Sequence, residues 1–362
     1  MKRQIGAGQL IAVLLCSRII VTLNFSLGGD TEVLSLATCM GALLAVPITV
    51  IISLPGIVFS LKEKSSPVDC AYKICRPLGD VSAVVYTLFF MYIAAITLMR
   101  FDAFSLSSMQ TVELPVAFSV LMLLPILYMA IKGIEPIARF AGVLVFVAFF
   151  AIVVIFLFLI PRMSLYNLVT PFYSGVSEVF KNTALIISNS VEPLMFMFLL
   201  KTAKGVKYRH FLIFSAFAVL AIEIILISIV AVLGDFNAIQ VFPYYTVSSS
   251  IGGAVIERLD ALQTGVWTIL ALIKSAVCIY LAGVCLEKIV PKKFRTLMYI
   301  ALVVLLGVII AVFSGDFETL RVKLGIYSST AVILGATLVV PGILYAVYGI
   351  QKAVKSRSGD LQ

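Results

Sequence analysis

The sequence predicts an all-α polytopic membrane protein with ten transmembrane helices. Of its 362 residues, 62% are hydrophobic and 12% are charged, and the mean hydropathy is +1.13. A soluble domain of this length needs more polar residues than these to cover its surface. Two further observations, the spacing of the apolar stretches and the placement of the basic residues, support the same class.

Ten apolar stretches approach the length of about 20 residues that a helix needs to cross a bilayer. We place the whole chain, residues 1–362, in one permease-like transmembrane domain. The expected spans cover approximately residues 9–28, 34–60, 81–99, 115–131, 139–160, 183–200, 211–233, 261–286, 296–313 and 326–349.

Basic residues are dense in alternate connections between these stretches, as the positive-inside rule describes for cytoplasmic loops. Both ends of the chain belong to the dense side, so we expect both termini in the cytoplasm of a multi-pass protein of the cell membrane. The net charge of +9 is therefore explained by topology and by contact with membrane lipid, and it does not indicate a nucleic-acid partner. The sparse side holds only Arg100, Arg162, Lys181, Arg258, Arg321 and Lys323.

The sixth stretch contains a polar interruption, Ser188-Asn189-Ser190-Val191-Glu192-Pro193. Pro193 has no N–H to donate to the carbonyl of Asn189, and its ring disfavours the α conformation at Glu192. Free backbone groups are costly in hydrocarbon, so a helix broken at this depth indicates a site enclosed by protein. The alternative is a proline kink whose Glu192 is satisfied by a neighbouring helix.

Two cations, Arg18 and Lys274, also fall inside predicted spans, where a charge normally faces the protein interior and a partner. An Arg18–Glu192 pair can hold the two ends of a zwitterion, or it can be purely structural. We expect Pro193 and Lys274 to take part in coupling or gating. The expected substrate-binding residues are Ser17, Arg18, Ser188, Asn189, Ser190 and Glu192.

The ten stretches divide into two halves of five, and because five is odd the second half enters the membrane inverted. This plan resembles the inverted repeat of LeuT-type transporters, whose helices 1 and 6 are interrupted near the midplane. The expected repeats are residues 9–160 and 183–349, interrupted at Cys16-Ser17-Arg18 and at Glu192-Pro193. Sodium-coupled LeuT-type relatives hold an ion against the first helix, and the resemblance implies that Lys274 takes that ion's place.

The outer side of the predicted bundle carries one long connection, residues 234–260. It is too polar to span the membrane and too apolar for a free linker, so it is either a lid over the outer vestibule or an ordinary surface loop. Arg100 and Asp102 follow the third span on the same side, where they can reach the interface. We assign them no function at this stage.

Several motifs resemble the GerAB-type B subunits of endospore germinant receptors, which belong to the amino acid/polyamine/organocation transporter superfamily. The motifs are Gln9 at the start of the first span, Phe242-Pro243, the run Glu257-Arg258-Leu259-Asp260-Ala261-Leu262, Trp267 and Lys274. The resemblance implies a receptor in the spore inner membrane that binds a small nutrient such as an amino acid. It also implies two partners, a larger A subunit and a lipoprotein C subunit.

The leading functional prediction is a germinant receptor subunit that binds a nutrient at a midplane site and signals germination. A proton-coupled amino-acid symporter and a ligand-gated water or ion channel are the alternatives. An enzyme is not expected, because the sequence lacks the metal-binding, phosphate-binding and nucleophile motifs of common enzyme classes. We therefore expect neither a cofactor nor a metal ion.

Overall fold

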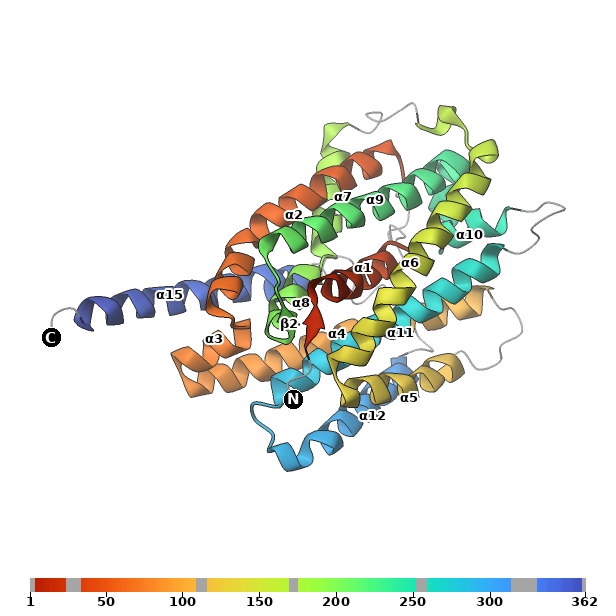
Figure 1. The fold of residues 1–362 in the computed structure, drawn as a ribbon. Helices are drawn as coiled ribbons and strands as arrows, with labels where there is room; N and C mark the ends of the chain where they lie inside the picture. Colours follow the sequence, from red (N-terminus) through yellow and green to blue (C-terminus); the bar gives the residue numbers. More distant parts are fainter. Residues whose placement is uncertain are drawn as a thin grey trace.

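The computed structural model describes residues 4–23, 34–108, 116–168, 175–251, 259–313 and 331–359. These residues form a bundle of helices with α1 (Ala7–Leu23) in its interior (Figure 1). The other long helices are α2 (Leu36–Glu63), α4 (Arg76–Ser108), α5 (Val116–Lys132), α6 (Ile134–Leu159), α9 (Tyr208–Leu233), α11 (Leu259–Leu286), α12 (Arg295–Phe313) and α15 (Val340–Gly359). The shorter elements are β1 (Ile5–Gly6), α3 (Pro67–Ile74), η1 (Ile160–Arg162), η2 (Leu165–Leu168), α7 (Val176–Ser188), α8 (Glu192–Leu199), η3 (Leu200–Thr202), β2 (Ala203–Lys204), η4 (Gly234–Ile239), α10 (Pro243–Ser249), η5 (Lys292–Phe294) and the π-helical turn η7 (Gly335–Val339).

The described part of the chain contains eight helical segments that are long and apolar enough to cross a membrane. Two further apolar helices, Ala7–Leu23 and Phe118–Lys132, are shorter. Large apolar side chains such as Leu124, Phe146 and Phe150 point outward and are strongly exposed, as expected for a surface that faces lipid. The predicted all-α polytopic membrane class is therefore confirmed.

The predicted interruption of the first span at Cys16-Ser17-Arg18 is wrong, because α1 runs as one helix from Ala7 to Leu23. The three residues include neither Gly nor Pro, so no backbone hydrogen bond is removed there. Ser17 and Arg18 find their partners outside α1 without any opening of the helix. Contacts with α6, α8, α9 and α11 enclose α1, which places its polar residues in the protein interior.

The break predicted next to Pro193 is present. Helix α7 ends at Ser188 and α8 begins at Glu192, with Asn189 at φ −90° and ψ 7° between them. Pro193 lies in the first turn of α8, where its missing N–H removes no helical hydrogen bond. Every residue of α8 is buried, so the break lies inside protein and away from lipid, which is the condition for irregular backbone at this depth.

Helix α7 is held by a close approach to α2. A Cβ atom on Gly41 of α2 would lie 2.9 Å from Cβ of Asn182 and 3.1 Å from the backbone nitrogen of Thr183. The Thr183 hydroxyl donates to the Gly41 carbonyl at 3.2 Å. Small residues allow such close packing between membrane helices, and here the contact fixes the segment that leads into the break.

One end of the bundle is tied together by Asp69 of α3. This residue is 6% exposed, pairs with Lys201, and accepts a hydrogen bond from Lys288 at 2.6 Å. Burial raises the pKa of Asp69, but hydrogen bonds from Lys201, Lys288 and Ser66 outweigh burial and hold the pKa well below its ordinary value. One carboxylate therefore joins α3 to the segments that follow α8 and α11.

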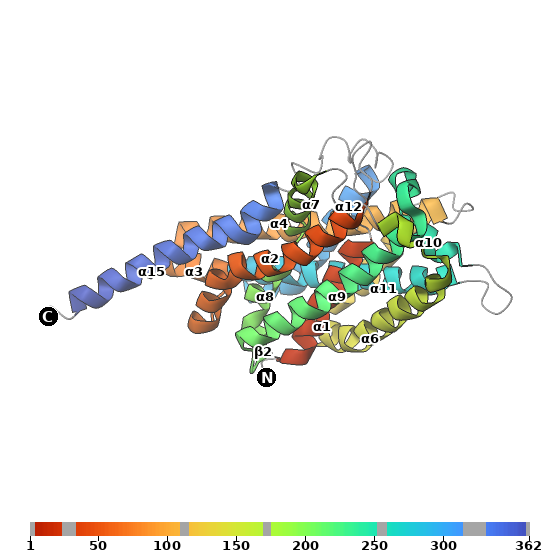
Figure 2. The same cartoon turned by 90° about the horizontal axis from the view of Figure 1, so that it is seen from above.

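The first described residues and α15 both lie toward the α3 end of the bundle (Figure 1). Strand β1 pairs in parallel with β2, with Ile5 opposite Ala203, and this places the first described residues beside the segment that follows α8. Helix α15 passes α3 and extends beyond the bundle at the same end (Figures 1 and 2). Lys352 of α15 donates to Glu63 of α2 at 2.7 Å.

Candidate functional site

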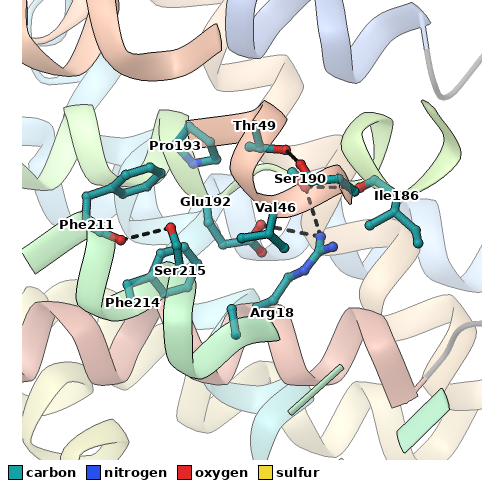
Figure 3. A pocket seen from close by; sticks show the side chains of 12 residues that line it. Arg18, Val46, Thr49, Ile186, Ser190, Glu192, Pro193, Phe211, Phe214 and Ser215 are labelled. Atoms are coloured by element: carbon teal, nitrogen blue, oxygen red, sulfur yellow. Dashed lines mark hydrogen bonds and ion pairs between the residues drawn. The ribbon is translucent and has the colours of Figure 1, made fainter. Parts of the chain in front are cut away.

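The break between α7 and α8 faces the middle of α1 through a buried ion pair. Nη1 of Arg18 lies 3.8 Å from Oε2 of Glu192 and donates to Oγ of Ser190 at 3.1 Å and to the Asn189 carbonyl at 3.4 Å. Ser17 donates to Oε1 of Glu192 at 3.0 Å. Figure 3 shows Arg18 reaching toward both Ser190 and Glu192. One turn of α1 therefore contacts the break and the first residue of α8.

The Arg18–Glu192 pair is deeply buried, with 5% and 1% of the two residues exposed. Removing two ions from water costs several kcal/mol each, so hydrogen bonds must complete the stabilisation. Ser17 supplies one to the carboxylate, and Ser190 and Asn189 accept from the guanidinium. The separation of 3.8 Å exceeds the spacing of about 2.7–2.9 Å in tightly bonded ion pairs, which leaves this pair open to a competing polar group.

Two small cavities adjoin this pair. The first, of about 20 Å³, is lined by Arg18 and Glu192, by Thr49 of α2 and by Ser215 of α9 (Figure 3). The second, of about 10 Å³, lies between Arg18, Asn189 and α9. A single water needs about 10–15 Å³, so each cavity has room for roughly one water.

A third cavity, of about 50 Å³, lies on another side of the break, and Lys274 of α11 lines it. Lys274 is 3% exposed. Its Nζ donates a hydrogen bond to the backbone carbonyl of Ser17 at 3.4 Å. Lys274 thus contacts Ser17, the residue of α1 whose hydroxyl donates to Glu192. The same cavity is lined by Asn189 and Val191 of the break.

The other predicted site residues are spread around the break. Asn189 lines the second and third cavities, and Ser190 and Pro193 line the first. The Ser188 hydroxyl donates to the Leu185 carbonyl at 2.7 Å, and Ser188 lines none of the three cavities. The structure therefore brings Ser17, Arg18, Asn189, Ser190 and Glu192 together and leaves Ser188 beside them.

Sequence reasoning missed Arg100, which lines the third cavity with Thr97 of the same helix. The predicted third span ends at residue 99 and leaves Arg100 outside it. In the structure, α4 continues to Ser108 and includes Arg100. Asp102 is 1% exposed and accepts a hydrogen bond from Ser119 of α5 at 2.5 Å, so this charge also lies inside the bundle. A signal was available, because Arg100 and Thr97 share one helical face at a spacing of three residues.

A group of aromatic side chains joins α4 and α11 to the start of α10. Trp267 of α11 stacks on Phe104 of α4 at 3.8 Å between ring centroids. Phe242, at the start of α10, contacts both rings edge-on at 5.3 and 5.5 Å. The outer connection predicted for residues 234–260 is described up to residue 251, and its α10 packs on α9, α11 and α6. Glu257 and Arg258 lie outside the described residues.

The family model for spore germination proteins matches residues 39–318. The chain belongs to this family. The resemblance to germination permeases is therefore confirmed, and the chain is a multi-pass membrane protein of the spore germination permease family. The match includes the break and Lys274 and begins after α1, which carries Ser17 and Arg18. A comparison with curated proteins found no match.

Proposed function

We propose that this protein is the B subunit of a germinant receptor and that it binds a small nutrient, an amino acid, beside the break between α7 and α8. Binding changes the position of α8 relative to α1, and this movement is the signal for germination. The protein acts in the spore inner membrane with a larger A subunit and a lipoprotein C subunit. These partners supply soluble parts to the receptor, and the described residues of this chain form mainly apolar helices.

The observation that carries this proposal is the ion pair of Arg18 and Glu192 at the break. A broken helix presents backbone N–H and carbonyl groups that an intact helix uses internally. Here those groups lie next to two opposite charges and beside cavities. An amino acid carries the same two charges, so it can compete for the partners that now hold α1 to α8.

The test is saturable binding of labelled small amino acids, including L-alanine and L-valine, to the purified protein in proteoliposomes. We expect at least one to bind, with protein-free liposomes as the background. Uptake into the lumen, measured in parallel, separates a sensor from a symporter or a channel. If none of a complete set of amino acids binds, the proposed function is contradicted.

We also propose ten membrane crossings, with α1 and α5 added to the eight longer segments. The two halves of five helices form an inverted repeat in which the sixth crossing is broken and the first is whole. The α3 end, toward which β1 and α15 lie, then faces the cytoplasm.

The native Cys75 reports this topology, because it is exposed at the end of α3 and the other five cysteines are buried. We expect an impermeant thiol reagent to leave Cys75 unmodified in intact cells and to label it after permeabilisation. The Cys75→Ser variant gives the background in both states. Labelling of Cys75 from outside intact cells would contradict the orientation.

Lys274 allows a prediction about coupling. Its ammonium group contacts the Ser17 carbonyl, where a sodium ion could otherwise bind carbonyl oxygens of α1. We therefore expect amino-acid binding to stay within twofold when sodium is replaced by choline. We expect Lys274→Met to weaken binding by at least about tenfold, in line with the loss of one charge-assisted hydrogen bond. A sodium requirement in the wild-type protein would remove this role for Lys274.

A further inference from the structure

An apolar groove of about 350 Å³ lies where α11 ends and α12 begins. Leu286 and Val290 line it from the end of α11 and the connection that follows, and α12 supplies most of the remaining wall. All eight of its lining residues are apolar. Its volume falls within the range of about 300–1,000 Å³ that is usual for ligand pockets. The groove shares no lining residue with the three cavities at the break, so it lies outside the proposed nutrient site.

The groove extends along the start of α12 for about the depth of one membrane leaflet. Its lining residues recur on one face, at Phe294, Leu297, Ala301 and Leu305. A helix rises about 1.5 Å per residue, so this stripe is roughly 16 Å long, close to half of the hydrocarbon core of about 30 Å. Phe294, Leu297 and Leu305 are 48%, 60% and 48% exposed. The groove therefore opens at the surface of the bundle and suits one hydrocarbon chain.

The connection at one end of the groove is strongly basic, and half of its positive charges are already paired. Its basic residues are Lys288, Lys292, Lys293 and Arg295. Lys288 pairs with Asp69 of α3 at 2.6 Å, and Arg295 pairs with Glu287 at 2.7 Å. These two ion pairs hold the connection against α3 and against the end of α11.

The other two cations, Lys292 and Lys293, are exposed. Neither makes an ion pair with a carboxylate in the part of the chain that the structure describes. Both lie in the same short turn, η5, as Phe294, which lines the groove. Two uncompensated positive charges are thus adjacent to the end of an apolar groove, at the end of the bundle that Lys288 ties to α3.

We propose that this groove binds one anionic phospholipid, with an acyl chain along α12 and the phosphate of its headgroup at Lys292 and Lys293. Juxtamembrane lysines attract anionic lipids, and each added charge strengthens the attraction. The charge of the headgroup matches the two unpaired lysines, and the chain matches the apolar lining. The proposal goes beyond nutrient binding. The bound lipid steadies the end of α11, the helix that carries Lys274.

The first experiment measures lipid selectivity in the purified wild-type protein. Native mass spectrometry counts the lipids retained as phosphatidylglycerol or phosphatidylcholine with identical chains is titrated into detergent. We expect one phosphatidylglycerol to bind at least about tenfold more tightly than phosphatidylcholine, because two lysines meet its net negative charge. Equal retention of the two lipids overturns the proposal, since the groove is then an ordinary part of the lipid-facing surface.

The second experiment assigns this selectivity to the two lysines. Lys292→Gln/Lys293→Gln should reduce the preference for phosphatidylglycerol to less than about threefold. Lys204→Gln/Lys207→Gln is the matched control, because it removes two exposed lysines near the start of α9 and should leave the preference unchanged. All four side chains are exposed, so both variants should fold. A full preference in Lys292→Gln/Lys293→Gln contradicts the assignment.

The third experiment fills the groove. Ala301→Phe should weaken phosphatidylglycerol binding by at least about fivefold, because the ring takes the place of methylene groups of the chain on the apolar lining. Val304→Phe is the control, because Val304 is 59% exposed on the same helix and does not line the groove. It should leave binding within about twofold.

Two results of the groove experiment would overturn the proposal. Unchanged phosphatidylglycerol affinity in Ala301→Phe would show that no acyl chain lies in the groove. Conversion of a dimer into a monomer by Ala301→Phe, in detergent without added lipid, would show that a second copy of the chain occupies it. If Ala301→Phe folds poorly, Lys292→Gln/Lys293→Gln still decides the question.

Discussion

Glu192→Gln alone should greatly reduce the amount of folded protein in the membrane. The substitution keeps the shape of the side chain but leaves Arg18, which is 5% exposed, without its counter-charge. Breaking a buried ion pair on one side costs about 3–5 kcal/mol, a large part of the stability of an ordinary domain. We expect a marked fall in melting temperature and in the yield of monodisperse protein after detergent extraction.

Glu223→Gln provides the matched control for this change. Glu223 is also a carboxylate inside a membrane helix, and one of its oxygens is buried without a hydrogen-bond partner in the described structure. Removing a charge that stabilises no partner should leave the yield unchanged or raise it. Equal stability of Glu192→Gln and the wild-type protein would contradict the account of the pair.

Asp69→Asn is the second change with a large expected effect, because it removes the carboxylate shared by Lys201 and Lys288 at the α3 end. Both lysines are partly exposed, so they can turn to water, which limits the loss to about 1–3 kcal/mol. The amide oxygen of Asn can still accept the hydrogen bond that the Ser66 N–H donates to Asp69 at the start of α3. We expect a lower melting temperature at neutral pH, while Glu135→Gln on the exposed surface of α6 should cost less than about 0.5 kcal/mol.

The contribution of Asp69 should also depend on pH in one direction. Its pKa in the folded protein is lowered, so its contribution to stability is fully present above the ordinary Asp pKa of about 3.9 and is lost as the pH falls below it. The difference in stability between the wild-type protein and Asp69→Asn should therefore be smaller at pH 3 than at pH 7. A difference that grows with acid would mean that Asp69 is held in its neutral form.

The helices were predictable because a bilayer imposes a length and an apolar composition that are visible in the sequence. The break was predictable for a local reason, since Pro193 lacks the N–H that a continuous helix needs. The expected interruption at Cys16-Ser17-Arg18 was inferred from symmetry with the second half of the chain. Symmetry alone does not remove any backbone hydrogen bond of α1. A helix opens where its own residues disrupt it, and these three do not.

Tertiary contacts account for what the sequence left out. The charges of Arg100 and Asp102 lower the local hydropathy and so suggest the end of a span. Helix α4 nevertheless continues to Ser108, and Asp102 accepts a hydrogen bond from Ser119 of α5 inside the bundle. The two lysine partners of Asp69 lie more than 130 residues away in the chain. No local pattern relates residues at such a distance, so the α3 ion pairs become visible only in the folded structure.

The double variant Arg18→Met/Glu192→Gln tests the central claim most directly, because it removes both charges and leaves neither stranded. We measure the folded yield and the binding of the amino acid that the wild-type protein binds. The account predicts that the yield recovers relative to Glu192→Gln and that binding at the break stays lost. Recovery of both would contradict it and would show that the pair only holds α1 against α8.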